Sequence, residues 1–104
     1  MADPTQTLTA AEVSAAALAD WRQDGESLTA RFAAGDFATG LELVTRIGAS
    51  AEQANHHPDI TLTYPEVSVV LSSHDVGGIT SRDLDLARLI SDHAATLGIS
   101  AAQG

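Results

Sequence analysis

The segment from Phe37 to Asn55 places the strongest constraint on the fold, because its apolar residues recur at steps of three and four. The apolar positions are Phe37, Leu41, Val44, Ile47 with Gly48, and Ala51. This spacing predicts an amphipathic helix of about five turns with one buried face. The helix is expected to end near Asn55, because the residue before Pro58 is driven towards extended geometry. Two adjacent histidines, His56 and His57, therefore follow directly after the helix.

A period of two replaces the helical period after the histidines, in the stretch DITLTYPEVSVVLSS. Apolar or aromatic residues alternate with polar ones on both sides of Pro65-Glu66, which predicts two strands separated by a turn. Upstream, Asp24-Gly25 marks a tight turn between two extended segments, so a hairpin is expected there. The alternating positions are Leu28, Ala30 and Phe32 in the hairpin, Ile60, Leu62 and Tyr64 before the proline, and Val67, Val69 and Leu71 after it.

Two further helices are predicted towards the ends of the chain. Thr9 and Glu12 fit a capping box in front of an alanine-rich helix that runs to about Leu18. Thr80 or Ser81 is expected to cap a last helix. The apolar face of that helix comprises Leu84, Ala87, Ile90, Ala94 and Leu97.

The resulting order is helix, two strands, helix, two strands, helix. It predicts an α+β fold with a four-stranded antiparallel sheet and three helices on one face. In this interpretation residues 9–99 form a single domain, with a flexible tail at 1–8 and a frayed end at 100–104. Because only one face of the sheet is covered, we expect the chain to form a homo-oligomer, a dimer or a tetramer.

The composition narrows the classes of partner. The chain of 104 residues carries 14 acidic and 5 basic residues, a net charge of −9. This balance disfavours nucleic acid and anionic membrane surfaces, which bind basic patches. The absence of cysteine excludes disulfides, thiolate metal sites and cysteine nucleophiles. With 44% hydrophobic residues, no apolar run of membrane-spanning length and no secretory signal, a globular cytoplasmic protein is expected.

Three of the four histidines cluster in loops that the sequence predicts, namely His56, His57 and His74. Imidazole is the side chain whose ordinary pKa allows proton exchange near neutrality, so the three could transfer protons. Loop histidines that cap carbonyl groups explain the same pattern. A three-histidine zinc site is a further alternative, although neighbouring residues of an extended chain point to opposite sides. The residue types alone leave these alternatives open.

Nearby residues also permit two interpretations each. Glu52 lies one turn before His56 and either holds an imidazole or is a solvated helix residue. Asp83 either orients a group in the site or favours the positive end of the helix dipole. His93 is expected to be a solvated helix histidine, and Trp21 a residue of the core.

Taken together, these motifs resemble the pterin-4a-carbinolamine dehydratase family. The matching elements are Glu52-x-x-x-His56-His57-Pro58, Tyr64, and Ser73-His74-Asp75-x-x-Gly78-Ile79-Thr80-x-x-Asp83. Upstream, Trp21, Arg31-Phe32 and Asp36-Phe37 also match, so the resemblance covers about residues 8–98. It implies the same α+β fold and a hydro-lyase that dehydrates a 4a-hydroxytetrahydropterin to the quinonoid dihydropterin.

The resemblance also implies roles for individual residues. His56 and His74 take the acid and base positions, and His57 binds and positions the pterin. Loss of the 4a-hydroxyl needs an acid and loss of the N5 proton needs a base, which two imidazoles can supply. The predicted catalytic residues are His56, His57 and His74, and the predicted substrate-binding residues are Glu52, His57, Pro58, Ser73 and Asp83.

The resemblance implies that the reaction uses no cofactor and no metal. The partner is a pterin substrate, with a link to aromatic amino acid hydroxylases through the recycling of tetrahydrobiopterin. The alternative is a non-catalytic pterin-binding or protein-pairing module on the same fold.

Overall fold

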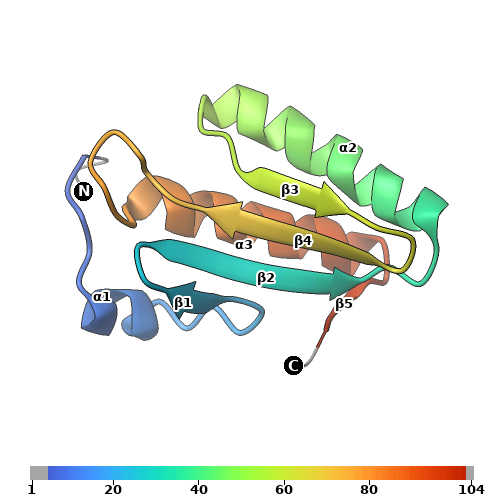
Figure 1. Cartoon of the computed structure of the whole chain (residues 1–104), viewed down its shortest axis with the longest axis horizontal. Coiled ribbons are helices and arrows are strands. Elements are labelled where there is room, and N and C mark those ends of the chain that lie inside the picture. The colour runs from blue at the N-terminus through green and yellow to red at the C-terminus, as the bar shows by residue number, and fades with distance from the viewer. Residues whose placement is uncertain (1–4, 103–104) are drawn as a thin grey trace.

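In the computed structural model, which describes residues 5–102, an antiparallel sheet carries the helices on one side (Figure 1). Four strands have the spatial order β1-β2-β4-β3, and a short fifth strand, β5, also pairs with β2. The strands are β1 (Arg22–Asp24), β2 (Ser27–Ala33), β3 (Asp59–Leu62), β4 (Glu66–Leu71) and β5 (Ser100–Ala101). The helices are α1 (Ala10–Ala15), α2 (Phe37–Ala54) and α3 (Ser81–Thr96). The predicted α+β architecture is confirmed.

Each helix begins at a side-chain cap, as the sequence indicates. Thr9 and Glu12 form the predicted capping box of α1, and Thr80 and Asp83 form a second one at α3. The Asp36 carboxylate accepts from the Thr39 N–H at 2.8 Å and so caps α2. Helix α1 ends at Ala15, before the expected Leu18.

The two central strands, β2 and β4, divide the sheet into an apolar and a polar face. Their registered pairs Leu28–Leu71, Ala30–Val69 and Phe32–Val67 are all buried beneath the helices. The alternate residues face the other way and include Thr29, Arg31 and Ser68. On that face Arg31 makes a two-point ion pair with Glu66, with both N–O distances at 2.9 Å. The uncovered face is therefore mostly polar.

The buried stripe of α2 differs from the one predicted. Phe37 and Leu41 are 47% and 49% exposed, although both were expected in the core. The physical reason is Gly40, where an added Cβ would lie 2.8 Å from Leu62 Cδ1. Because the helix approaches the sheet so closely there, the buried face of α2 is rotated by about one residue from the predicted face. It consists of Gly40, Leu43, Ile47, Ser50 and Ala51.

The buried stripe of α3 also departs from the prediction. Leu86 is fully buried, whereas the predicted Leu84 and Leu97 are only partly buried at the border of the core. The stripe consists of Asp83, Leu86, Ala87, Ile90 and Ala94. A carboxylate thus occupies the first position of an otherwise apolar line.

Residues 100–104 were expected to form a frayed end beyond the domain, but Ser100 and Ala101 form strand β5. Ser100 and Ala101 pair with Ala33 and Phe32, and the Ala102 N–H donates to the Arg31 carbonyl at 2.7 Å. Near the other end, the Leu8 N–H donates to the Ile79 carbonyl at 2.7 Å. Residues 1–4, 103 and 104, which belong to the predicted tail and frayed end, lie outside the described residues. Within residues 5–102, none of the helices has the length and apolar character needed to cross a membrane.

Candidate active site

Three segments that are distant in sequence meet at one end of the sheet. The C-terminal end of α2, the loop that follows β4 and the N-terminal end of α3 lie together there (Figure 1). Helix α2 delivers His56 and His57, the loop carries Ser73 and His74, and α3 begins with its capping residue Thr80. The fold therefore brings the dispersed motif residues to one place.

The position of His56 is fixed by how α2 ends. Asn55 adopts the left-handed conformation, with φ 51° and ψ 42°, which asparagine tolerates well. The following His56 N–H donates back to the Ala51 carbonyl at 3.1 Å, as in a Schellman motif. This turn directs the His56 side chain into the protein, where Nε2 lies 2.6 Å from Asp83 Oδ1. Both side chains are buried.

Asp83 is held by three donors. Its Oδ2 atom accepts from the Ser73 hydroxyl at 2.8 Å and from the Thr80 N–H at 2.9 Å. A carboxylate only accepts hydrogen bonds, so the remaining contact is His56 Nε2–H donating to Oδ1. The site thereby fixes the tautomer of His56 and leaves Nδ1 as its second nitrogen.

Nδ1 of His56 is accessible from outside. Among the described residues Nδ1 makes no hydrogen bond. Every fully buried side-chain nitrogen or oxygen of those residues has a hydrogen-bond partner, so Nδ1 is not fully buried. The atom must therefore reach the surface through the small exposed fraction of the ring. A histidine held at one nitrogen and open at the other can accept and donate a proton.

His57 has a different environment. Its Nε2 atom lies 2.5 Å from Glu52 Oε2, and both side chains are largely exposed. Pro58, which follows, is half-buried and directly precedes β3. The two adjacent imidazoles thus bind two different carboxylates.

His74 is exposed in the loop after β4 and makes no hydrogen bond within residues 5–102. Its predecessor Ser73 is buried and bridges to Gly78, with the Ser73 N–H donating to the Gly78 carbonyl at 2.8 Å. The bridge closes the loop. Ser73, the residue directly before His74, is also hydrogen-bonded to Asp83. The predicted Ser73, Asp83 and His56 are therefore directly bonded, whereas His74 is only adjacent to them.

Sequence analysis did not single out Arg82, which links the loop to α3. Its guanidinium donates from Nη2 to Asp75 Oδ1 at 2.8 Å and from Nε to the Thr80 hydroxyl at 3.3 Å. The hydrogen bond from Arg82 is the main reason why the pKa of Asp75 is lowered, and the charge of His56 contributes least. The sequence signal for this ion pair was the acidic Asp75 directly after His74 and the basic Arg82 directly before Asp83.

The fourth histidine lies outside this cluster. His93 Nε2 is 2.7 Å from the Ser50 hydroxyl, between α3 and α2, so it is partly buried and not a solvated residue as expected. In the part of the chain that the structure describes, no three histidine or acidic side chains group in a way that could hold a metal ion.

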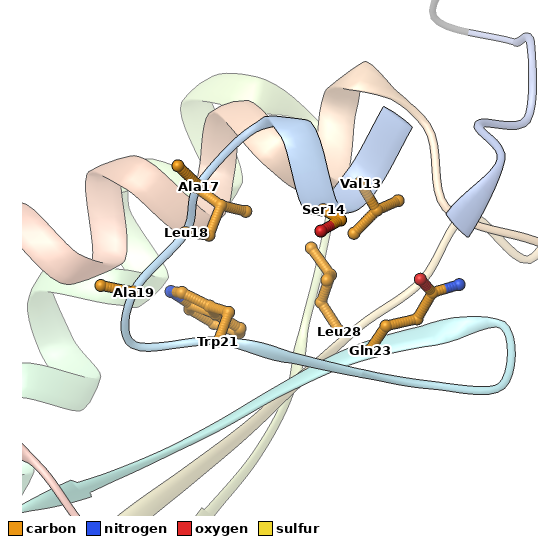
Figure 2. Close-up of a pocket in the computed structure, with 8 residues that line it drawn as sticks. All are labelled: Val13, Ser14, Ala17, Leu18, Ala19, Trp21, Gln23 and Leu28. Atoms are coloured by element: carbon orange, nitrogen blue, oxygen red, sulfur yellow. The ribbon is translucent and has the colours of Figure 1, made fainter. Parts of the chain in front are cut away.

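A hollow of about 410 Å³ lies away from the histidines, between α1 and the β1–β2 hairpin (Figure 2). Its walls are mostly apolar, with Trp21 and Leu28 on one side and Val13 on the other. Trp21 packs edge-on against Phe32 and donates from Nε1 to the Ser91 hydroxyl at 3.0 Å, in agreement with its predicted core role. None of the residues predicted for the site lines this hollow.

The fold and the site define a small α+β protein with buried and exposed histidine–carboxylate pairs at one end of its sheet. The sequence model of the family described as "Pterin 4 alpha carbinolamine dehydratase" matches residues 6–93. The chain belongs to this family, which confirms the resemblance seen in its motifs.

Individual relatives agree with this assignment. The chain is 45% identical over 83 residues to a protein of Thermosynechococcus vestitus named "Putative pterin-4-alpha-carbinolamine dehydratase", which covers 80% of this chain and 87% of the relative. A protein of the same name from Nocardia farcinica is 42% identical over 77 residues, or 74% of this chain and 81% of the relative.

Solved structures agree as well. The crystal structure of a transcriptional coactivator/pterin dehydratase from Brucella melitensis is similar, with TM-score 0.82 and 31% identity, over 86% of this chain and 99% of that one. A pterin dehydratase-like protein described as a RuBisCO assembly factor in the α-carboxysome has TM-score 0.59 and 17% identity, over 90% and 96% of the two chains. That second likeness shows the fold alone.

Proposed function

We propose that the chain dehydrates a 4a-hydroxytetrahydropterin, a pterin-4a-carbinolamine, to the quinonoid dihydropterin and water. In this reaction the C4a–O bond breaks and the departing hydroxyl takes a proton from a general acid. A general base removes the N5 proton, and the electron pair of the N–H bond forms the C4a=N5 double bond. The reaction consumes no oxidant and no reductant, so correctly placed proton carriers suffice.

The observation that carries this proposal is the buried pair of His56 and Asp83. The carboxylate holds Nε2 at 2.6 Å, and Nδ1 of the same ring remains accessible. An imidazole with one nitrogen held and the other open is suited to proton transfer. Two more donors to Asp83, from Ser73 and Thr80, keep that carboxylate in place.

The other predicted residues divide the remaining roles. In the proposal His74, exposed on its loop, is the second proton carrier. His57, exposed and paired with Glu52, binds and positions the pterin together with Pro58.

The test is stopped-flow measurement of dihydropterin formation from synthetic 4a-hydroxytetrahydropterin. The wild type is expected to exceed the rate in buffer, and His74→Gln to lose about 10²–10⁴-fold of the turnover. His93→Gln is the matched control, because it removes a histidine that bonds Ser50 outside the cluster. A wild-type rate equal to that of buffer would refute the proposal, and equal rates for wild type and His74→Gln would remove His74 from it.

The alternative proposal is a non-catalytic module that uses the same fold to bind a pterin or to pair with another protein. The fold of the RuBisCO assembly factor makes this worth testing, although that likeness extends to the fold alone. Tight binding of a non-reacting reduced pterin without dehydration above the buffer rate would favour the alternative.

The proposed setting is the recycling of tetrahydrobiopterin in the cytoplasm, as a partner of an aromatic amino acid hydroxylase.

We further propose that the chain forms a homo-dimer or a homo-tetramer. Support comes from Phe37 and Leu41, which lie one turn apart on α2 and are each about half exposed. Light scattering of wild type and of the double variant Phe37→Ser, Leu41→Ser tests this proposal, and a wild-type monomer would contradict it.

A further inference from the structure

We propose that Arg82 is a positioning residue of the site, whose guanidinium holds the loop of residues 73–78, and with it His74, against the start of α3. The proposal deepens the proposed function, because its effect on turnover depends on the catalytic role of His74. It concerns a residue that makes no hydrogen bond to any of the three histidines among the described residues.

The first argument is the geometry of the guanidinium. Nη2 of Arg82 donates to Asp75 Oδ1 at 2.8 Å, so the side chain reaches across to the residue directly after His74. Nε donates to the Thr80 hydroxyl at 3.3 Å, at the N-terminal cap of α3. The planar guanidinium spans two directions that a single ammonium cannot serve together. One side chain therefore joins the middle of the loop to the N-terminal cap of α3.

The second argument is that a series of hydrogen bonds links Arg82 to Asp83, and each residue of the series donates to the next. The Ser73 hydroxyl has one proton, which goes to Asp83 Oδ2, so Ser73 must accept in its 2.9 Å contact with the Thr80 hydroxyl. Thr80 is then the donor to Ser73, and its oxygen accepts from Nε and from the backbone N–H of Arg82. The series runs from Arg82 through Thr80 and Ser73 to Asp83, and Asp83 in turn holds His56.

The third argument is that His74 has little else to hold it. It is exposed and makes no hydrogen bond in the part of the chain that the structure describes. The loop is closed at its base by the Ser73–Gly78 bridge, and the Val76 N–H donates to the Ser73 carbonyl at 3.1 Å. On the outer side of the loop, the ion pair of Asp75 with Arg82 is the contact that restrains the residue next to His74. A reacting group misplaced by about 1 Å can lose on the order of 100-fold in rate.

The experiment compares Arg82→Gln, Arg82→Lys and Asp75→Asn with the control Arg88→Gln. Arg88 lies on the same helix and forms an exposed pair with Asp85 at 3.5 Å, so its removal matches the change in charge. The first readout is amide hydrogen exchange of Ser73, Val76 and Gly78. Arg82→Gln is expected to lower their protection about 10-fold, and the control less than about 2-fold.

The second readout is the division between kcat and KM in pterin dehydration. Arg82→Gln is expected to lower kcat about 10-fold with KM within about 2-fold, because Arg82 restrains the part of the loop that carries His74, whereas His57 and Pro58, which are proposed to position the pterin, lie outside the loop. Arg82→Lys should recover part of the kcat by restoring the charge opposite Asp75. If Arg82→Gln fails to fold, Asp75→Asn removes the same ion pair from the exposed side of the loop.

The two readouts separate this proposal from the proposed function. Equal loop protection in Arg82→Gln and Arg88→Gln would overturn the positioning role, whatever the turnover. Reduced protection with unchanged kcat in an active enzyme would overturn the link to His74. Reduced protection in a protein whose wild type does not dehydrate the pterin would refute the proposed function and still support the hold of Arg82 on the loop.

Discussion

Two histidine–carboxylate pairs, formed by consecutive histidines, differ in almost every physical respect. The His56–Asp83 pair has side chains 9% and 0% exposed, whereas the His57–Glu52 pair has side chains 57% and 78% exposed. The Asp83 carboxylate accepts two further hydrogen bonds, while the Glu52 carboxylate has no other hydrogen bond among the described residues. Identical residue types at adjacent positions thus form one preorganised unit and one solvated contact.

The backbone explains how neighbouring side chains diverge. Asn55 turns the chain at the end of α2 and directs His56 inward. Pro58 holds its preceding residue, His57, away from helical geometry. His57 consequently folds back towards α2, where Glu52 lies five residues earlier. Two imidazoles that bind separate carboxylates are better suited to two different roles than to a shared ligand.

The largest expected contrast concerns turnover. His56→Gln should lower kcat for 4a-hydroxytetrahydropterin about 10²–10⁴-fold, because it removes the buried proton carrier. His57→Gln should act mainly on KM, since the exposed residue is proposed to bind the pterin. Steady-state kinetics of both variants checks the contrast, and equal losses of kcat would eliminate the proposed division of roles.

The next contrast concerns the carboxylates and the free energy of unfolding. Asp83→Ala leaves buried donors of Ser73, Thr80 and His56 without an acceptor, and we expect a loss of about 3–5 kcal/mol. Glu52→Ala removes an exposed, solvent-screened contact and should cost at most about 0.5 kcal/mol.

Urea unfolding of the two alanine variants at neutral pH measures this difference. The unfolding slope should stay constant, so that the midpoints report stability. Losses of similar size in Asp83→Ala and Glu52→Ala would show that burial does not distinguish the pairs.

A smaller contrast separates two consecutive serines. Ser73→Ala removes a buried hydroxyl that donates to Asp83 and accepts from Thr80, and it should cost about 1–3 kcal/mol. Ser72→Ala is the matched control, since its hydroxyl donates to the Glu26 carbonyl at an exposed position and should change stability by less than about 0.5 kcal/mol. The same unfolding experiment applies, and a neutral Ser73→Ala would argue against a tightly coupled network around Asp83.

The smallest expected effect is the pH dependence of the loop. The hydrogen bond from Arg82 lowers the pKa of Asp75 from its usual value near 3.9. The stability that this carboxylate contributes is therefore fully present above about pH 4 and is lost as the pH falls through the lowered folded pKa. Asp75→Asn should melt slightly below wild type at pH 7, with the difference shrinking only in acid. A difference that is constant from pH 7 down to the lowest pH at which both proteins fold would contradict this cause.

Periodicity made most of the fold predictable, and its failures have physical reasons. The helices and strands follow from steps of three, four and two, but the buried line of α2 is turned because Gly40 lets the helix approach Leu62. Such a close approach depends on a residue distant in sequence. Strand β5 spans only Ser100–Ala101, too short for any alternation to be recognised.

The candidate site was predictable in its residue types and less so in its contacts. Asp83 fits the first turn of any helix, so the sequence could not decide between a dipole partner and a buried acceptor. Its place at the head of the α3 stripe decides this, together with its bonds to His56 and Ser73. Arg82 was missed because an arginine in a first helical turn ordinarily indicates a solvated side chain.

The most direct test of the account is a double-mutant cycle of His56→Gln and Asp83→Asn, measured as the stopped-flow rate of 4a-hydroxytetrahydropterin dehydration. If the buried pair works as one proton-transfer unit, Asp83→Asn should lower the wild-type rate at least about 10-fold and change the His56→Gln rate less than about 2-fold. Losses that multiply independently would contradict the central claim, as would a wild-type rate no faster than that of buffer.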